Sequence, residues 1–291
     1  MNRSKLISAT ALATVMSATA ANAELSLSGF YAATAADSDG GGVSHGTSTS
    51  SMYVTYSDTL DNGMGIVFNI SASAGWHGAD IFIDTGVGTL GLGDGQDSSV
   101  DKTDGSPAIN TLNKYGPRFG SAFVDGDAVS GASIMYTSPA ISGFTAKVSR
   151  GMEDATNDAV MSYAVTGSVM GVGLAAGVSS IDYKAAGTSD IDPSFVTASY
   201  SLGGINLGFA QYDSDGASEE TQFGASTSLG GYTVGVAFAE DDAATDTDYM
   251  HIGVIKSLGA LSYSIEYLEA DVSGTATGDS DTWNFSYIVG F

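Results

Sequence analysis

Residues 283–291, at the end of the chain, alternate large apolar or aromatic side chains with small or polar ones. A period of two is the pattern of a β-strand whose two faces meet different surroundings. The apolar face carries Trp283, Phe285 and Tyr287, and aromatic residues concentrate where proteins meet a membrane interface. The segment therefore predicts a strand that closes a β-barrel in a membrane, with Phe291 as its final residue.

The first 23 residues have the features of an export signal. Arg3 and Lys5 precede an apolar stretch at 6–20, and residues 21–23 (Ala-Asn-Ala) match a signal-peptidase cleavage site. The apolar stretch is too short to anchor the chain as a helix. We therefore expect residues 1–23 to be removed and residues 24–291 to form a single exported domain.

Composition excludes several classes of protein. The chain has no cysteine, which rules out disulfides, thiol catalysis and thiolate metal sites. Without Arg3 and Lys5, 7 basic residues remain against 33 acidic ones, which gives a net charge of −26. Nucleic acid is excluded as a partner because phosphate binding needs basic surface.

Runs with a period of two, bounded by Gly, Asp, Asn, Ser or Pro, indicate about sixteen antiparallel strands, with fourteen or eighteen as the neighbouring even counts. The predicted strands are 24–33, 51–58, 64–73, 79–85, 87–94, 131–138, 143–150, 157–166, 170–181, 193–201, 204–212, 219–228, 231–239, 247–257, 260–269 and 281–291. Short Gly-rich turns, such as 61–63, alternate with mostly longer acidic loops, such as 34–50 and 95–130. This asymmetry is typical of an all-β, transmembrane barrel of the outer membrane.

Each predicted strand has one apolar face and one face of small or polar residues. In 260–269, Leu261 and Ile265 alternate with Ser262 and Ser264. An exported soluble β-sandwich would also alternate, but its outer face is normally charged. Because the polar faces here are mainly Ser, Thr, Gly and Ala, they fit a wet interior opposite a surface that contacts lipid.

With these strands in place, the chain resembles the general porins of Gram-negative outer membranes, especially the short porins of alphaproteobacteria. The resemblance rests on the export signal, the first strand (ELSLSGFY at 24–31), the sixteen strands, Phe291 and the position of the longest link, 95–130, between strands five and six. Residues 116–120 (GPRFG) are similar to the Pro-x-Phe-Gly stretch of the family's inner loop. The resemblance implies a homotrimer in the outer membrane and a loop that folds into the lumen.

The loop at 95–130 is the predicted selectivity element, because a sixteen-stranded barrel otherwise leaves an open aqueous channel. A loop that caps the barrel from outside is the alternative. The period of two in 143–150 turns Lys147 toward the lumen. The family's arrangement of acids opposite bases implies a pore constriction built from Asp97, Asp101, Asp104, Lys114, Arg118, Asp125, Asp127 and Lys147.

Other chemistry has little support in the sequence. His45, His77 and His251 lie in no motif for a catalytic nucleophile, so we expect no enzyme activity and no catalytic residues. Two Asp-Ser-Asp-Gly stretches, 37–40 and 213–216, lack the rest of a calcium loop. We expect no cofactor and no dedicated metal site, with weak calcium binding by the acidic loops as the open alternative.

The expected function is passive diffusion of small hydrophilic solutes and ions, with a preference for cations because acids outnumber bases. The competing class is a barrel that does not conduct and acts as an adhesin, a receptor or a structural protein.

Overall fold

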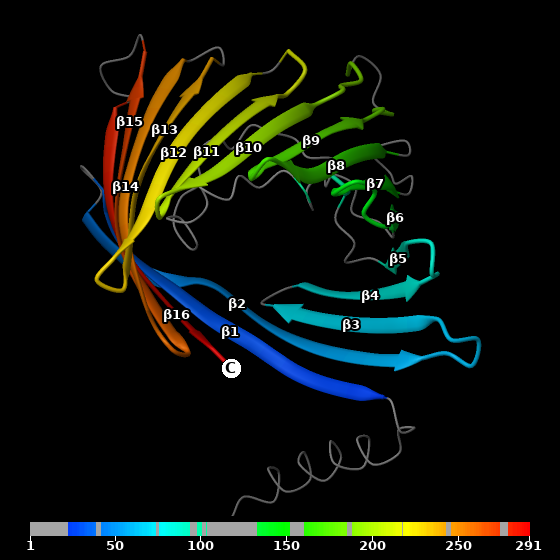
Figure 1. The fold of residues 1–291 in the computed structure, drawn as a ribbon. Coiled ribbons are helices and arrows are strands. Elements are labelled where there is room, and N and C mark those ends of the chain that lie inside the picture. The colour runs from blue at the N-terminus through cyan, green and yellow to red at the C-terminus, as the bar shows by residue number, and fades with distance from the viewer. Residues whose placement is uncertain are drawn as a thin grey trace, which may run out of the picture.

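The computed structural model describes residues 23–38, 42–73, 76–93, 98–100, 103, 133–151, 160–184, 188–216, 218–242, 246–273 and 279–291. In these residues, sixteen strands form one antiparallel sheet that closes into a barrel (Figure 1). Every strand lies beside its neighbours in sequence, and β1 pairs with β16. The predicted fold class and strand number are confirmed.

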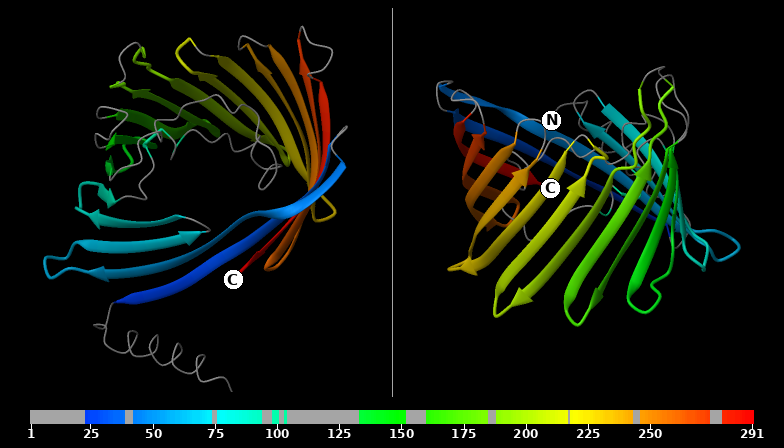
Figure 2. Two further views of the ribbon diagram at one scale, coloured as in Figure 1. Left: turned by 180° about the vertical axis from the view of Figure 1, so that it is seen from behind. Right: turned by 90° about the horizontal axis from the view of Figure 1, so that it is seen from above.

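The strands are β1 (Glu24–Ser38), β2 (Gly42–Thr59), β3 (Gly65–Ser73), β4 (Trp76–Asp84), β5 (Thr89–Gly93), β6 (Ser133–Thr137), β7 (Phe144–Gly151), β8 (Met161–Val169), β9 (Val172–Ser180), β10 (Ser194–Leu202), β11 (Ile205–Asp213), β12 (Glu219–Leu229), β13 (Tyr232–Asp241), β14 (Thr247–Leu258), β15 (Leu261–Val272) and β16 (Ser280–Gly290). Figure 2 shows these strands tilted around the barrel, with the short turns at one rim.

Alternation along the strands determines which side chains face outward. In β13, Tyr232 and Phe238 are exposed on the outer face, whereas Ala237 and Ala239 are buried on the inner face. Apolar outer residues and small inner residues are the arrangement that lipid outside and water inside require. The described residues contain no helix long and apolar enough to cross a membrane.

The turns at the short-turn rim need backbone conformations that favour glycine. The two-residue link between β12 and β13 is Gly230-Gly231, with φ of 60° and 77°. Positive φ at both central positions matches the twist of a tight hairpin and costs little without a Cβ. Glycine thus marks the ends of β12 and β13, whereas the predicted break at 167–169 lies inside β8, which ends at Val169.

The barrel closes where β1 meets β16. Phe30 pairs with Gly290, and the backbones of Gly29 and Phe291 exchange hydrogen bonds of 3.1 and 3.0 Å. A Cβ added to Gly29 would lie 2.7 Å from the ring of Phe291, so the missing side chain makes room for this ring. The prediction that the last strand closes the barrel is confirmed.

The predicted loop at 34–50 is wrong. Residues 34–38 and 42–50 extend β1 and β2, and the ladder between them continues to Ser38 and Gly42 across an irregularity between Ala32 and Ala33. The extension of β1 also pairs with β16, from Thr34–Ser286 to Ser38–Thr282. Partners on both sides hold residues 34–38 as a strand, and β1 holds residues 42–50, although the Ser, Gly and Asp content of 34–50 is typical of a loop.

Two other expectations concern the ends of elements. The expected link at 74–78 is shorter, because β4 already begins at Trp76. The expected export signal, 1–23, lies outside the described residues except for Ala23, and its removal remains a prediction.

Candidate functional site

The inner wall of the barrel is built largely from small and polar side chains. Register places Ser149 of β7 opposite Ser162 of β8, and Ser162 opposite Ser179 of β9. All three serines are buried, and the hydroxyls of Ser162 and Ser179 lie 2.7 Å apart in a hydrogen bond. Hydroxyl groups on this face give the inner wall polar groups that hydrogen-bond to one another.

The chain that follows β5 contacts this inner wall in its described part, residues 98–100 and 103. The backbone N–H of Ser99 donates to the hydroxyl of Ser149 at 2.8 Å, and both residues are buried. Val100 is fully buried and packs in one cluster with Ala175 of β9 and Phe195 of β10. These contacts place the beginning of the predicted pore loop inside the barrel.

Lys147 lies on the inner face of β7, two residues before Ser149. Its ammonium donates a 3.1 Å hydrogen bond to the hydroxyl of Thr103, whose own hydroxyl donates to the carbonyl of Ser99 at 2.8 Å. The period of two therefore gave the correct direction for this side chain. Its role at a constriction remains a prediction.

The other seven predicted constriction residues, Asp97, Asp101, Asp104, Lys114, Arg118, Asp125 and Asp127, lie outside the described residues.

Acidic groups on the inner wall were not selected from the sequence as site residues. Glu220 of β12 pairs in register with Asp241 of β13, and both side chains are buried. The side-chain amide of Gln222 donates to Glu220. The sequence could have indicated these acids through the alternation of inner and outer residues along a strand. By that alternation Glu220 and Gln222 lie on the same inner face as buried Ser226.

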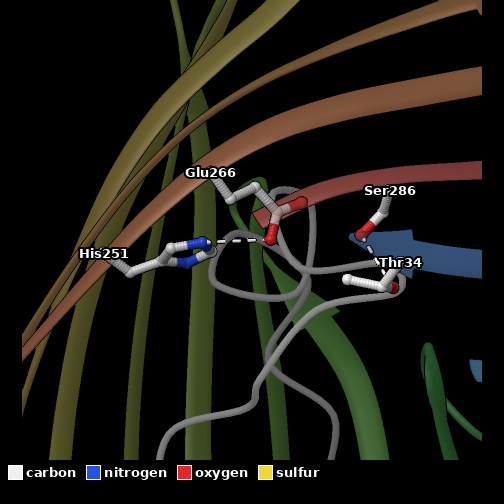
Figure 3. A network of polar contacts seen from close by, with 4 residues as sticks. All are labelled: Thr34, His251, Glu266 and Ser286. Carbon is white, nitrogen blue, oxygen red and sulfur yellow. Dashed lines mark hydrogen bonds and ion pairs between the residues drawn. The ribbon is translucent and has the colours of Figure 1, made fainter. Parts of the chain in front are cut away.

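A second buried acid lies farther around the wall. Figure 3 shows Glu266 of β15 pointing toward His251 of β14, with Nε2 of His251 3.3 Å from Oε2 of Glu266, an ion pair when the imidazole is protonated. Both side chains are 1% exposed. On the closing strands, the hydroxyls of Thr34 and Ser286 share a 3.1 Å hydrogen bond. The lumen side of the described strands thus carries more carboxylates than lysine or arginine groups.

The second Asp-Ser-Asp-Gly stretch forms a turn between β11 and β12. Oδ1 of Asp213 accepts the backbone N–H of Asp215, and Oδ2 of Asp215 accepts the N–H of Asp192, each at 2.8 Å. Asp215 and Gly216 have positive φ. The pattern is explained by turn formation, since Asp side chains commonly hydrogen-bond nearby backbone in this way.

Comparison with known proteins identifies the family. The family model described as Gram-negative porin matches residues 8–290. The chain belongs to the Gram-negative porin family. No curated protein matches the sequence of this porin.

Solved porin structures share the fold at low sequence identity. A loop-deletion variant of OmpT from Vibrio cholerae is 14% identical with a TM-score of 0.70, covering 93% of this chain and 100% of that one. An anion-selective porin from Comamonas acidovorans is 16% identical with a TM-score of 0.70, covering 92% and 100%. A triple mutant of the Rhodopseudomonas blastica porin is 16% identical with a TM-score of 0.66, also covering 92% and 100%.

Family and fold together define the molecule's setting. The protein is an outer-membrane β-barrel of a Gram-negative bacterium, and its family points to a channel rather than an enzyme. The polar inner wall and apolar outer wall described above are the physical requirements of that setting.

Proposed function

We propose that the protein is a passive diffusion channel for small hydrophilic solutes and ions that favours cations. The observation that carries the proposal is the charge of the inner wall. Within the described strands, Asp80, Glu220, Asp241 and Glu266 lie on the inner face, and Lys147 is the one lysine or arginine there. A lumen lined by one sign of charge concentrates ions of the opposite sign.

The charge of the whole chain supports the same direction. After removal of residues 1–23, the net charge of −26 includes the acidic stretches at the loop rim, among them Glu240, Asp242 and Asp246. Fold alone does not determine selectivity, since one structural neighbour is described as an anion-selective porin. The side chains of this chain, and not its fold, therefore favour cations in our proposal.

Permeation through liposomes tests the channel function directly. We expect liposomes containing the refolded protein to swell in isotonic solutions of small sugars, with rates that fall as the sugar becomes larger. Heat-dependent mobility on a gel shows that the barrel is folded in the same preparation. A folded barrel that admits no sugar would support the competing class, an adhesin, receptor or structural barrel, and would overturn the channel proposal.

We also propose that three copies assemble, with the closing strands at the contact. The outer face there exposes Leu27, Tyr31, Trp283 and Phe285, and the rings of Tyr31 and Tyr287 lie 6.3 Å apart. A continuous strip of aromatic surface fits a neighbouring barrel. The mass of the folded protein in mild detergent tests this assembly, and a monomer under those conditions would contradict it.

A further inference from the structure

The first turn of the predicted pore loop is attached to the wall by one apolar side chain. Val100 is 0% exposed although it lies outside the strands, and its neighbours Ala175 and Phe195 come from the inner faces of β9 and β10. Phe195 in turn packs against Tyr212 of β11, with ring centroids 6.4 Å apart. The inner faces of β9 and β10 therefore present an apolar contact surface to Val100.

A glycine creates the space for Val100. Gly177 of β9 pairs in register with Phe195, and a Cβ added to Gly177 would lie 2.5 Å from Cε1 of Phe195 and 3.0 Å from Cγ2 of Val100. The backbone of Gly177 has no positive φ that would itself demand glycine. Space is therefore the reason for glycine here, because any side chain would overlap the ring of Phe195 and crowd Val100.

Hydrogen bonds on both sides of Val100 fix the orientation of the turn. Ser99 donates its backbone N–H to the hydroxyl of Ser149, and the N–H of Thr103 donates to the carbonyl of Val100 at 2.8 Å. Lys147 then donates to the hydroxyl of Thr103. The apolar contact of Val100 and the two hydrogen bonds to β7 together hold the turn against the wall.

We propose that Val100, seated between Gly177 and Phe195, is a positioning residue that holds the start of the pore loop against β9 and β10 and thereby sets the conductance of the channel. The proposal rests on the channel function proposed above. Val100 acts through the position of the loop backbone and of the hydrogen bond from Lys147 to Thr103.

Engineered cysteines test whether Val100 lies against Ala175, without any measurement of transport. The chain has no cysteine, so Val100→Cys with Ala175→Cys introduces the only two thiols. With copper phenanthroline as the oxidant, the two thiols should form a disulfide rapidly. A shift in the gel mobility of the heat-denatured protein reports that disulfide. The matched control pairs Val100→Cys with Ala176→Cys, because Ala176 is adjacent but lies on the outer face of β9. Equal yields in both pairs, or no disulfide in the first, would overturn the proposal.

Single-channel recording then tests the effect on the pore. Joining positions 100 and 175 should leave the conductance unchanged, because the docked turn belongs to the conducting state. Val100→Ala removes two buried methyl groups and should lower the ratio of docked to undocked turn about tenfold. We expect added open-channel noise and a changed conductance in this variant, at unchanged heat stability of the barrel.

Val196→Ala is the control for that recording, since it makes the same change on the outer face of β10, where the side chain is 50% exposed. A disulfide that abolishes conductance, or a Val100→Ala channel identical to the native one, would overturn the proposal. If the native protein conducts nothing, the proposed channel function is wrong. The disulfide yields would still decide whether Val100 lies against Ala175.

Discussion

Among single residues, Lys147 is the base whose position in the pore is best defined. Its hydrogen bond to Thr103 holds the ammonium on the lumen side of β7, where the other charged groups of the described strands are mostly acids. A fixed positive charge in a narrow aqueous path repels passing cations. Lys147 should therefore moderate the cation preference that we propose for the acids of the inner wall.

Removing that charge should strengthen the preference for cations. A unit charge about 10 Å away in water changes an ion's energy by about 0.4 kcal/mol, with opposite sign for potassium and chloride, so Lys147→Gln should raise the ratio of potassium to chloride permeability about fourfold. The reversal potential in a potassium chloride gradient measures this ratio. Lys256→Gln is the matched control, because the ammonium of Lys256 lies 4.3 Å over the ring of Tyr232 on the outer face. Equal shifts in the two variants would contradict the assignment of Lys147 to the lumen.

Between elements, the contact of β1 with β16 is the one that turns an open sheet into a barrel. Gly29 lies beneath the ring of Phe291 and also close to the backbone of Ser51, so that a Cβ would meet both at 2.7 Å. The site has no room for a methyl group. Overpacking at such a junction forces backbone shifts in two strands at once.

Gly29→Ala should therefore lower the free energy of unfolding by about 1–3 kcal/mol. The midpoint temperature of the heat-induced change in gel mobility, for the native protein and the variant, measures the loss. Gly46→Ala on β2 is the control, because a Cβ there meets nothing within 4 Å. A Gly29→Ala barrel as stable as this control would show that the junction adapts without cost.

Strand positions were largely predictable because two signals coincide, alternation within strands and glycine in the short turns. For β14, the prediction of 247–257 compares with Thr247–Leu258 in the structure. The same signals failed at 34–50, where pairing with β16 and β2 outweighs a composition typical of loops. Long-range partners of this kind do not appear in a local sequence pattern.

The candidate site was predictable only in part. Parity alone turned Lys147 inward, and it would also have turned Glu220 and Glu266 inward. What sequence cannot supply is the distance across the lumen, since residues that oppose each other there are far apart in the chain. The contact of Val100 with Ala175 and Phe195 could not be predicted for the same reason, because it joins a loop to two later strands.

At the scale of the whole molecule, the net charge of −26 should make the native channel cation-preferring, most strongly in dilute salt. The Debye length falls from about 30 Å at 0.01 M to about 3 Å at 1 M, so the field of the rim acids reaches across the mouth only at low ionic strength. Reversal potentials at the same concentration ratio but different mean salt measure the effect. Swelling rates with neutral sugars should be unaffected by salt and serve as the control. Anion preference at low salt would contradict the electrostatic argument.

The extension of β1 and β2 over residues 34–38 and 42–50 has a further consequence, which concerns association with other chains. Ladder pairing of β2 with β3 begins only at Ser51, so in the described strands residues 42–50 pair with β1 alone. Unpaired backbone along such an edge is a template for joining another chain. Apart from Val43, the described side chains there are hydrophilic or absent, as at Ser44 and Gly46. We therefore expect this edge to add another chain less readily than an apolar edge would.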